Sequence, residues 1–315
     1  MHNYKVAIIG AGSMAREHIK AFSSISSVSV VGIHSRTATK AKALAAEFSI
    51  PKVVDNLSDL YKETKADIVV ITVSILGMLE VAKEVVKHPW LCLFEKPVGL
   101  HYAESVQINE LAIANNAKCF VGLNRRHYSS TRHVLTDLEL NSEKRIINVF
   151  DQEDPYIALQ DDKQPEAVVK NWMYANSIHM IDYLRLLGRG EITAVTPIVH
   201  WNADDPSLVV AKIEFSSGDT GIYQAVWNSP GPWAVTVTTH SKRWEMRPLE
   251  QASFQMHGSR KIETIPCQTH DKDFKAGFYV QAEEAIRAVK NEPHRLPTLT
   301  DSLETMRLIK LIYEI

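Results

Sequence analysis

Apolar residues in the first 123 positions recur in short runs separated by longer amphipathic segments. The runs are rich in β-branched residues, as expected of buried parallel strands, and the segments between them repeat apolar residues every three or four positions, which is typical of helices. The predicted strands are 6–9, 28–33, 52–54, 67–73, 91–94 and 118–123, and the predicted helices are 16–24, 38–48, 57–64, 79–87 and 103–115. This alternation predicts an α/β fold with a doubly wound parallel sheet, which binds ligands at the carboxyl ends of its strands.

The pattern changes after residue 124, where apolar and polar residues alternate over several segments. Alternation over 209–215, 220–227 and 234–239, with turn residues between them, predicts an antiparallel sheet. A further strand is predicted over 145–150, and a long loop over 151–166, which is polar and contains proline. The predicted helices of this half are 134–140, 177–187, 277–290 and 302–315. The second half is therefore predicted to be an α+β domain.

Composition excludes several classes of partner. The chain has 315 residues, enough for two domains, and its 35 Lys and Arg against 37 Asp and Glu leave a net charge of −2. We therefore expect neither nucleic-acid nor membrane binding, and no apolar stretch approaches the ~20 residues of a transmembrane helix. Three distant cysteines indicate reduced thiols rather than disulfides or a metal site, and Asp161-Asp162 is interpreted as solvated loop rather than as a metal ligand. A soluble cytoplasmic protein without a metal is expected.

The first predicted strand runs into Gly10-Ala11-Gly12-Ser13-Met14-Ala15, a G-x-G-x-x-A dinucleotide fingerprint. Gly10 permits a tight turn, Gly12 lets backbone N–H groups approach a diphosphate, and Ala15 allows close packing of helix and strand. The diphosphate would lie at a helix N-terminus, which favours anions. We predict cofactor contacts from residues 10–14; the alternative is a glycine-rich turn that binds nothing.

The end of the second strand bears on the choice of cofactor. An acidic residue there binds the 2′-hydroxyl of NAD, whereas an arginine accommodates the 2′-phosphate of NADP. Here the sequence is Ser35-Arg36-Thr37, and no Asp or Glu occurs between Glu17 and Glu47. Arg36 can hold a phosphate through charge-assisted hydrogen bonds, with Ser35 and Thr37 as additional donors. This predicts NADP in preference to NAD; alternatively, Arg36 stacks on the adenine of either cofactor.

Other strand ends are predicted to lie at the same edge. Thr72-Val73-Ser74 follows the fourth strand, Glu95-Lys96-Pro97 the fifth, and Asn124 the sixth. We predict cofactor contacts from Thr72, Val73, Ser74, Glu95, Lys96 and Asn124. A lysine at the mouth of a cleft can also stabilise a developing alkoxide, although Lys96 could instead be a surface residue that ends a strand.

The predicted helix 177–187 carries a polar stripe. Asn176, His179 and Asp182 are three residues apart and therefore share one helix face. The ordinary pKa of histidine, near 6.5, suits proton exchange with a substrate hydroxyl. Alternatively, His179 is a core residue that bonds to Asp182, and Asn176 caps the helix.

Taken with the fingerprint, several motifs along the chain resemble those of the Gfo/Idh/MocA oxidoreductases, which include glucose-fructose oxidoreductase, inositol 2-dehydrogenase and dimeric dihydrodiol dehydrogenase. The motifs are Glu95-Lys96-Pro97, Val121-Gly122-Leu123-Asn124-Arg125-Arg126, the helix with His179 and Asp182, and Gly277-Phe278-Tyr279. The resemblance implies an NAD(P)-binding Rossmann domain over 1–123 and a substrate and oligomerisation domain over 124–315 with a large, mostly antiparallel open sheet. It also implies a homodimer or homotetramer formed through that sheet, and the helix 302–315 is expected to pack on the first domain.

The resemblance also implies a reaction: hydride transfer between nicotinamide and a carbinol or carbonyl carbon of a sugar, cyclitol or sugar-derived, including nucleotide-linked, substrate. Lys96 would hydrogen-bond the reacting oxygen, Pro97 would follow a cis peptide, and His179 would be the general acid/base. The predicted catalytic set is Lys96, His179, Asn176 and Asp182.

The chain departs from the family pattern at several positions. Ala175 stands where many relatives have an aspartate, Trp172-Met173-Tyr174 replaces a glycine-rich segment, Gly77 replaces a frequent histidine, and Val73 replaces a proline. Two other functions therefore stay open: an NAD-dependent glycosidase of the same architecture, which retains its cofactor, and a non-enzymatic NADP-binding sensor.

Several further side chains could meet the substrate. Arg125, Arg126 and Lys170 could bind a carboxylate or a nucleotide diphosphate, or could be solvated surface residues. Trp172 and Trp233 could stack on a sugar ring, or could belong to the core or an interface.

Overall fold

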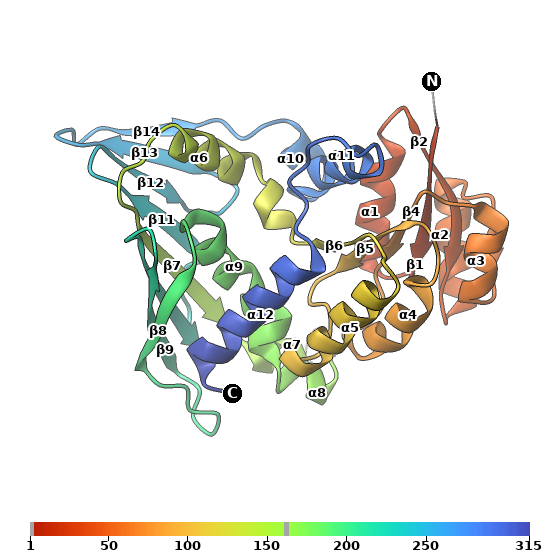
Figure 1. Ribbon diagram of the computed structural model, residues 1–315, viewed down its shortest axis with the longest axis horizontal. Coiled ribbons are helices and arrows are strands. Elements are labelled where there is room, and N and C mark those ends of the chain that lie inside the picture. Colours follow the sequence, from red (N-terminus) through yellow and green to blue (C-terminus); the bar gives the residue numbers. More distant parts are fainter. Residues whose placement is uncertain (1–2, 161–163) are drawn as a thin grey trace. The chain divides into compact units, whose positions relative to one another are not determined.

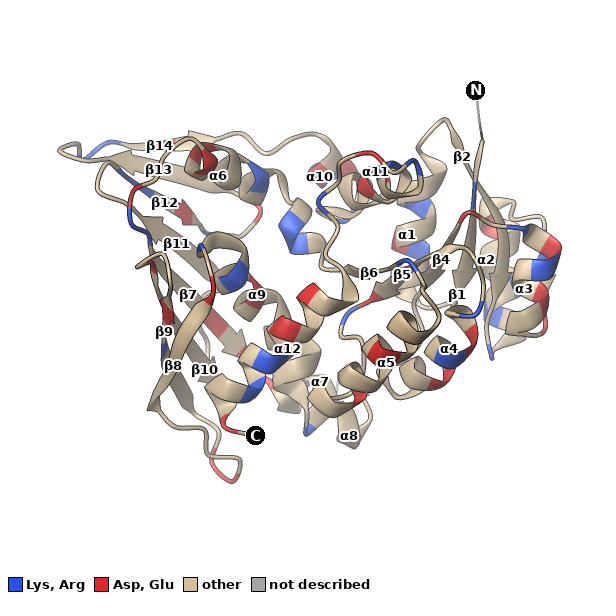
Figure 2. Cartoon of the chain, viewed as in Figure 1, with Lys and Arg blue, Asp and Glu red and all other residues tan. Residues whose placement is uncertain are grey.

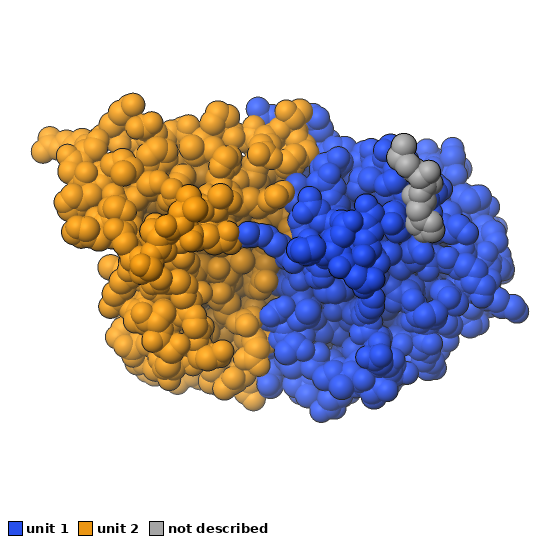
Figure 3. Space-filling model, turned by 45° about the horizontal axis from the view of Figure 1, so that its top comes forward, with its two compact units in different colours: residues 1–124, 272–303 blue, residues 125–271, 304–315 orange. Residues whose placement is uncertain are grey.

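The computed structural model describes residues 3–160 and 164–315. The chain divides into two compact units, coloured separately in Figure 3. Unit 1 comprises residues 1–124 and 272–303, and unit 2 comprises residues 125–271 and 304–315.

Unit 1 contains a six-stranded parallel sheet with strand order β3-β2-β1-β4-β5-β6 (Figure 1). Its strands are β1 (Tyr4–Ile9), β2 (Val28–His34), β3 (Val53–Val54), β4 (Ile68–Ile71), β5 (Leu91–Glu95) and β6 (Cys119–Gly122). The order reverses between β1 and β4, so a crevice for ligands is expected where these two strands end. The predicted doubly wound sheet is confirmed.

The helices of unit 1 follow the strands as the sequence pattern predicts. They are α1 (Ser13–Ser23), α2 (Ala38–Phe48), α3 (Leu57–Thr64), α4 (Met78–Val85), α5 (Tyr102–Ala114) and, from the end of the chain, α11 (Phe278–Val289), with a short 3₁₀ turn η1 (Ile75–Gly77) before α4. Figure 1 shows α11 beside α1, where Phe278 and Ala282 join the core formed by Ile19 and Phe22.

The return of residues 272–303 to unit 1 differs from the predicted division at residue 123. The apolar face of α11 is one reason, because it is buried in the core of the first sheet. Backbone pairing is the other: the Val121 N–H donates to the Pro297 carbonyl at 2.9 Å, and Phe120 forms a β-bridge with Thr298. These contacts cover the outer edge of β6, which would otherwise expose unpaired backbone groups.

Unit 2 contains an eight-stranded sheet with strand order β14-β13-β12-β11-β7-β10-β9-β8. Its strands are β7 (Ile146–Glu153), β8 (Ile192–Val199), β9 (Leu208–Phe215), β10 (Thr220–Trp227), β11 (Ala234–Thr238), β12 (Lys242–Met246), β13 (Ala252–Met256) and β14 (Ile262–Ile265). Neighbouring strands are antiparallel except β7 and β10, which are parallel. Alternate residues of β7, β9 and β10 are buried, as expected of a sheet that is covered on one face. The predicted mostly antiparallel sheet is confirmed.

The helices of unit 2 include one that carries the predicted catalytic stripe. They are α6 (Ser129–Glu139), α7 (Pro155–Gln160), α8 (Glu166–Val169), α9 (Ile178–Leu187) and α10 (His270–Asp273), with a 3₁₀ turn η2 (Asn124–His127) and a π-helical turn η3 (Met173–Ser177) directly before α9. The stripe is therefore carried by two helical segments, with Asn176 in η3 and both His179 and Asp182 in α9.

The predicted long loop over 151–166 is wrong for the residues that the structure describes. Strand β7 continues to Glu153, and α7 and α8 occupy much of the remainder. Residues 161–163, which include the Asp161-Asp162 pair expected in solvated loop, lie outside the described residues. The prediction failed because Asp151 and Glu153 are polar yet buried, so their polarity hid the continuing strand.

The last helix, α12 (Leu299–Tyr313), contains the boundary between the units, which falls after Leu303. Its residues from 304 onward belong to unit 2, contrary to the expectation that 302–315 packs on the first domain. Aromatic packing explains this: the Tyr313 ring lies against Trp201 and Trp227, and its hydroxyl lies 3.0 Å from that of Tyr223.

The distribution of charged residues and the hydropathy of the helices do not indicate a particular class of binding partner. Figure 2 shows acidic and basic residues interspersed along helices such as α4 and α12. None of the helices in the described part of the chain is long and apolar enough to cross a membrane.

Candidate active site

A cavity of about 440 Å³ lies in unit 1 where β1, β2 and β4 end. This is within the usual range of ~300–1,000 Å³ for ligand pockets. Three predicted segments line it together, namely Gly10-Ala11-Gly12, Ser35-Arg36-Thr37 and Thr72-Val73-Ser74. They converge because the carboxyl ends of neighbouring parallel strands meet at one edge of a sheet.

Close packing at this edge of the sheet requires a glycine at position 10. Its φ is +110°, and an added Cβ would lie 2.5 Å from Thr72 Oγ1. Thr72 is itself held, since its N–H and its hydroxyl both donate to the Ile9 carbonyl, at 2.7 and 3.0 Å. A side chain at position 10 would therefore push β1 and β4 apart.

Gly12 leaves the N-terminus of α1 open. It is the N-cap residue and makes no side-chain cap, and an added Cβ there would meet no atom within 4 Å. The first turn of α1 contains no acidic residue. Its N–H groups and helix dipole therefore face the cavity with no acidic residue in the same turn, which fits the diphosphate of a dinucleotide.

A second part of the cavity is basic. Arg36 and Lys40 are exposed and line it together with Glu80, whereas Ser35 Oγ accepts a 3.3 Å hydrogen bond from the Thr37 N–H. Sequence analysis missed Lys40, although it lies in the first turn of α2 and four residues after Arg36. Two cations in one cavity fit a phosphate better than a neutral hydroxyl.

Glu95 is the last residue of β5, Lys96 and Pro97 follow it, and none of the three lines that cavity. Glu95 is buried and pairs with buried His18, with 2.7 Å between Oε1 and Nε2. Lys96 is partly exposed, and the Lys96-Pro97 peptide is cis, as the resemblance implies. The structure thus gives Glu95 a contact with His18, and its predicted contact with the cofactor stays a prediction.

Three other predicted cofactor residues also lie outside the lining of the cavity. Ser13 and Met14 form the first two positions of α1, directly after Gly12. Asn124 is buried, and its Nδ2 donates to the Ala276 carbonyl at 3.0 Å. That bond ties β6 to the segment that returns from the end of the chain.

In unit 2, the three stripe residues differ in their surroundings. His179 is the second residue of α9 and its exposed fraction is 8%. Asn176 Nδ2 donates to Glu153 Oε2 at 2.9 Å. Asp182 accepts two 2.6 Å hydrogen bonds from Arg126 and a third, at 2.9 Å, from the Thr305 hydroxyl.

The bidentate pair with Asp182 decides between the two interpretations of Arg126. The exposed fraction of its side chain is 14% and that of Asp182 is 4%, so Arg126 is not a solvated surface residue. Lys170, by contrast, is exposed and pairs only with exposed Glu166 among the described residues. The Asp182 carboxylate therefore holds a buried cation, and its predicted part in catalysis is untested.

Sequence analysis missed a buried pair of carboxyl groups, Asp151 and Glu153, on β7. They continue the face that buries Ile147 and Val149, and each has an exposed fraction of 1%. Asp151 Oδ2 accepts a 2.8 Å hydrogen bond from the Tyr223 hydroxyl, and Glu153 accepts bonds from Asn176 and from the Ser177 hydroxyl. The i, i+2 spacing after two apolar strand residues was the available signal.

Both carboxyl groups have raised pKa values. Burial raises the pKa of both, and the negative charge of Asp151 and the hydrogen bond between the two side chains raise that of Glu153 further. The same hydrogen bond and the positive charge of Arg125 act in the opposite direction on the pKa of Asp151. Of the two coupled groups, Glu153 therefore has the more strongly raised pKa.

Replacing Glu153 by glutamine is expected to weaken the dependence of stability on pH. Because the pKa of Glu153 is raised above its ordinary value of 4.5, the folded protein keeps a proton that the unfolded chain loses. The stabilisation that this proton provides is complete at pH values below the ordinary pKa. It decreases as the pH rises toward the pKa of the folded protein, so the free energy of unfolding falls by at most ~1.4 kcal/mol per pH unit. Glutamine is neutral throughout and removes that slope.

The measurement is the free energy of unfolding in urea from about pH 5 to about pH 8. Exposed Glu191, which also lies in unit 2, provides the control variant Glu191→Gln, for which the wild-type slope is expected. Equal slopes in the wild type and in Glu153→Gln would show that Glu153 is not protonated in this range.

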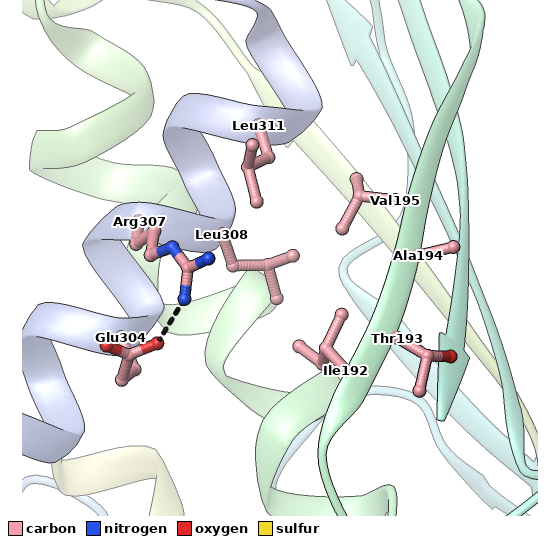
Figure 4. Close-up of a pocket in the computed structure, with 8 residues that line it drawn as sticks. All are labelled: Ile192, Thr193, Ala194, Val195, Glu304, Arg307, Leu308 and Leu311. Carbon is pink, nitrogen blue, oxygen red and sulfur yellow. Dashed lines mark hydrogen bonds and ion pairs between the residues drawn. The ribbon is translucent and has the colours of Figure 1, made fainter. Parts of the chain in front are cut away.

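Unit 2 also contains a smaller cavity of about 150 Å³ between β8 and α12, shown in Figure 4. Ile192, Val195, Leu308 and Leu311 line it, and Glu304 and Arg307 form an ion pair of 3.3 Å on the helix. It is below the usual size of a ligand pocket. Within the described residues, no group of three or more His, Cys, Asp or Glu side chains is arranged to hold a metal ion.

Comparison with known proteins finds a family match for the first part of the chain. The family model described as "Oxidoreductase family, NAD-binding Rossmann fold" (GFO_IDH_MocA) matches residues 4–123. None of the curated proteins matches the sequence.

Solved structures share the fold of the whole chain. A dehydrogenase from Chromobacterium violaceum aligns with a TM-score of 0.81 and 16% identity over 99% of this chain and 95% of its own. UDP-N-acetylglucosamine 3-dehydrogenase from Acidithiobacillus ferrooxidans aligns with a TM-score of 0.80 and 16% identity over 100% of this chain and 98% of its own. An oxidoreductase from Agrobacterium radiobacter was solved in complex with NAD+, L-tartaric acid and magnesium. It aligns with a TM-score of 0.78 and 13% identity over 99% of this chain and 96% of its own. Residues 4–123 thus match the Gfo/Idh/MocA family of oxidoreductases, and the chain shares its fold with these solved structures.

Proposed function

We propose that the protein is an NAD(P)-dependent dehydrogenase or reductase that acts on a carbinol or carbonyl carbon of a sugar, cyclitol or sugar-derived substrate. The observation that supports this most is the cavity of unit 1, where the open N-terminus of α1 at Gly12 and the basic side chains of Arg36 and Lys40 face one space. The shared fold with UDP-N-acetylglucosamine 3-dehydrogenase is consistent with a sugar-derived substrate.

The residues of the chain would bind, orient and handle the proton. When bound, the nicotinamide supplies the hydride acceptor or donor. In the oxidation direction, we propose that His179 takes the hydroxyl proton of the substrate while the Lys96 ammonium donates a hydrogen bond to the same oxygen and stabilises its developing negative charge. In reduction the proton moves from His179 to the carbonyl oxygen. Neither role depends on Ala175, where many relatives have an aspartate.

NADP is the proposed cofactor, and Arg36→Ala tests this choice. Because Arg36 faces the cavity with Lys40 and no acidic residue occupies the end of β2, its loss is expected to weaken NADP+ binding about tenfold, or ~1.4 kcal/mol, with little change for NAD+. The dissociation constants of both cofactors are measured by titration of protein fluorescence.

Lys42→Ala is the matched control, because Lys42 is exposed on the same helix and does not line the cavity. It is expected to bind both cofactors as the wild type does. Equal weakening of NAD+ and NADP+ by Arg36→Ala would instead support stacking of Arg36 on adenine.

We also propose that the eight-stranded sheet forms the contact of a homodimer or homotetramer. Ile146 on β7 and Ile198 on β8 are large apolar side chains with exposed fractions of 47% and 56%, which is consistent with an interface on this sheet.

A further inference from the structure

Trp233 presents a fixed aromatic ring at the surface of unit 2. It directly precedes β11, and its exposed fraction is 41%. The indole Nε1 donates a 2.8 Å hydrogen bond to the Gln152 carbonyl of β7. A ring that is exposed but held in place can stack on a ligand with little loss of conformational entropy.

The guanidinium of Arg125 lies over this ring. Its central carbon is 4.9 Å from the centroid of the Trp233 ring, Nη1 donates to Met180 Sδ at 2.8 Å, and a further hydrogen bond joins it to the Tyr128 side chain. A thioether is a weak acceptor, and a guanidinium has five N–H donors, so Arg125 can donate further hydrogen bonds.

Arg125 differs from Arg126 and Arg189 of unit 2 in its charge balance. Arg126 forms a bidentate pair with Asp182, and Arg189 forms one with Asp219. In the described part of the chain, no carboxylate lies within ion-pair distance of Arg125, although the charge of Arg125 lowers the pKa of buried Asp151 from farther away. A cation with spare donors beside an open ring suits an anionic ligand.

The contacts of this pair lead to the helical turn that carries His179. Gln152, which holds Trp233, lies between Asp151 and Glu153, and Glu153 bonds to Asn176 and Ser177 just before α9. Met180, which contacts Arg125, directly follows His179. All of these residues belong to unit 2, so the proximity holds within one unit.

We propose that Arg125 and Trp233 form a subsite that selects anionic sugars. The sugar ring stacks on the open face of Trp233, and a carboxylate or phosphate of the substrate accepts hydrogen bonds from Arg125. This inference rests on the proposed function and narrows its substrate to uronates and sugar phosphates, including nucleotide-linked sugars.

The experiment measures sugar binding rather than turnover. The full-length protein is labelled with 5-fluorotryptophan, and Trp233→Phe identifies the ¹⁹F resonance of position 233. D-glucuronate, glucose 6-phosphate and UDP-N-acetylglucosamine are titrated against D-glucose as the uncharged probe, with and without NADP+. At least one anionic sugar is expected to shift the resonance saturably and to bind at least about tenfold more tightly than glucose, a difference of ~1.4 kcal/mol.

Arg125→Met is expected to remove this preference for charge, because methionine keeps much of the side-chain volume and loses the guanidinium. Lys170→Met, which removes an exposed cation elsewhere in unit 2, is expected to keep it. Circular dichroism and thermal unfolding confirm that the variants are folded.

Equal affinity for glucose and for all three anions, no shift with any sugar, or an undiminished preference in Arg125→Met would each overturn the subsite. A preference for glucuronate alone, or for phosphates alone, supports it and identifies the group. The proposed function is tested separately, and the absence of NADP-linked turnover would refute it. Oxidation of neutral sugars without any preference for charged ones would support the function and refute the subsite.

Discussion

Lys96→Ala and His179→Ala are each expected to lower kcat/KM by about 10²- to 10⁴-fold on any substrate that the wild type oxidises. Lys96 follows β5 at the edge where ligands bind to such sheets, and His179 lies at the start of α9 with an exposed fraction of 8%. Removal of either group deprives the substrate oxygen of its hydrogen-bond donor or its proton acceptor. NADP+ affinity is expected to change less than threefold in His179→Ala, because the nucleotide contacts proposed for unit 1 are intact.

Initial rates at 340 nm and cofactor titrations check both statements. Lys87→Ala and His133→Ala are the matched controls, since both residues are exposed and lie outside every proposed contact. Near-normal turnover in either active-site variant would refute the assigned role.

The same assay separates the alternatives. A glycosidase that retains its cofactor would consume substrate with no net change in absorbance. A sensor would bind NADP+ tightly and turn over no sugar even as the wild type.

The first sheet was predictable because its strands are buried on both faces. Such strands leave continuous apolar runs, and the intervening helices α2 and α3 have the bounds that their patterns predict. β7 was predicted only in part, since Asp151 and Glu153 occupy positions where an apolar residue would have shown the strand. Their burial depends on partners from β10 and η3, which a local pattern does not reveal.

The candidate site was predictable to the extent that it follows from the topology of the sheet. Gly10, Arg36 and Thr72 line one cavity because they follow strands that are neighbours in a doubly wound order. Lys40 was missed because nothing in its helix distinguishes it from Lys42 until the cavity is known. The partner of Asp182 was missed for a similar reason, because the sequence does not show which helix face meets Arg126.

The return of residues 272–303 to unit 1 was also beyond local patterns. The amphipathic character of α11 was predicted, but the surface that it covers is on α1, more than 250 residues earlier in the chain. Pairing of Val121 with Pro297 adds a backbone contact that no hydrophobic period encodes.

Asp182→Ala is expected to lower the free energy of unfolding by about 3–5 kcal/mol. The variant removes the carboxylate from a guanidinium that is mostly buried, and it also removes the acceptor of the Thr305 hydroxyl. Asp182→Asn, which keeps one acceptor oxygen, is expected to lose less. In the double variant Asp182→Leu with Arg126→Met, much of the loss is expected to be recovered, because neither charge remains buried.

Urea unfolding at neutral pH measures these differences, with circular dichroism as the signal. The exposed pair of Lys170 and Glu166 provides the control, since Glu166→Ala is expected to cost less than about 1 kcal/mol. The kinetics of Asp182→Asn then test the catalytic role predicted for Asp182. If the residue acts by holding Arg126, kcat/KM falls much less than in His179→Ala; an equal fall in a stable Asp182→Asn variant would place Asp182 in the proton-transfer machinery.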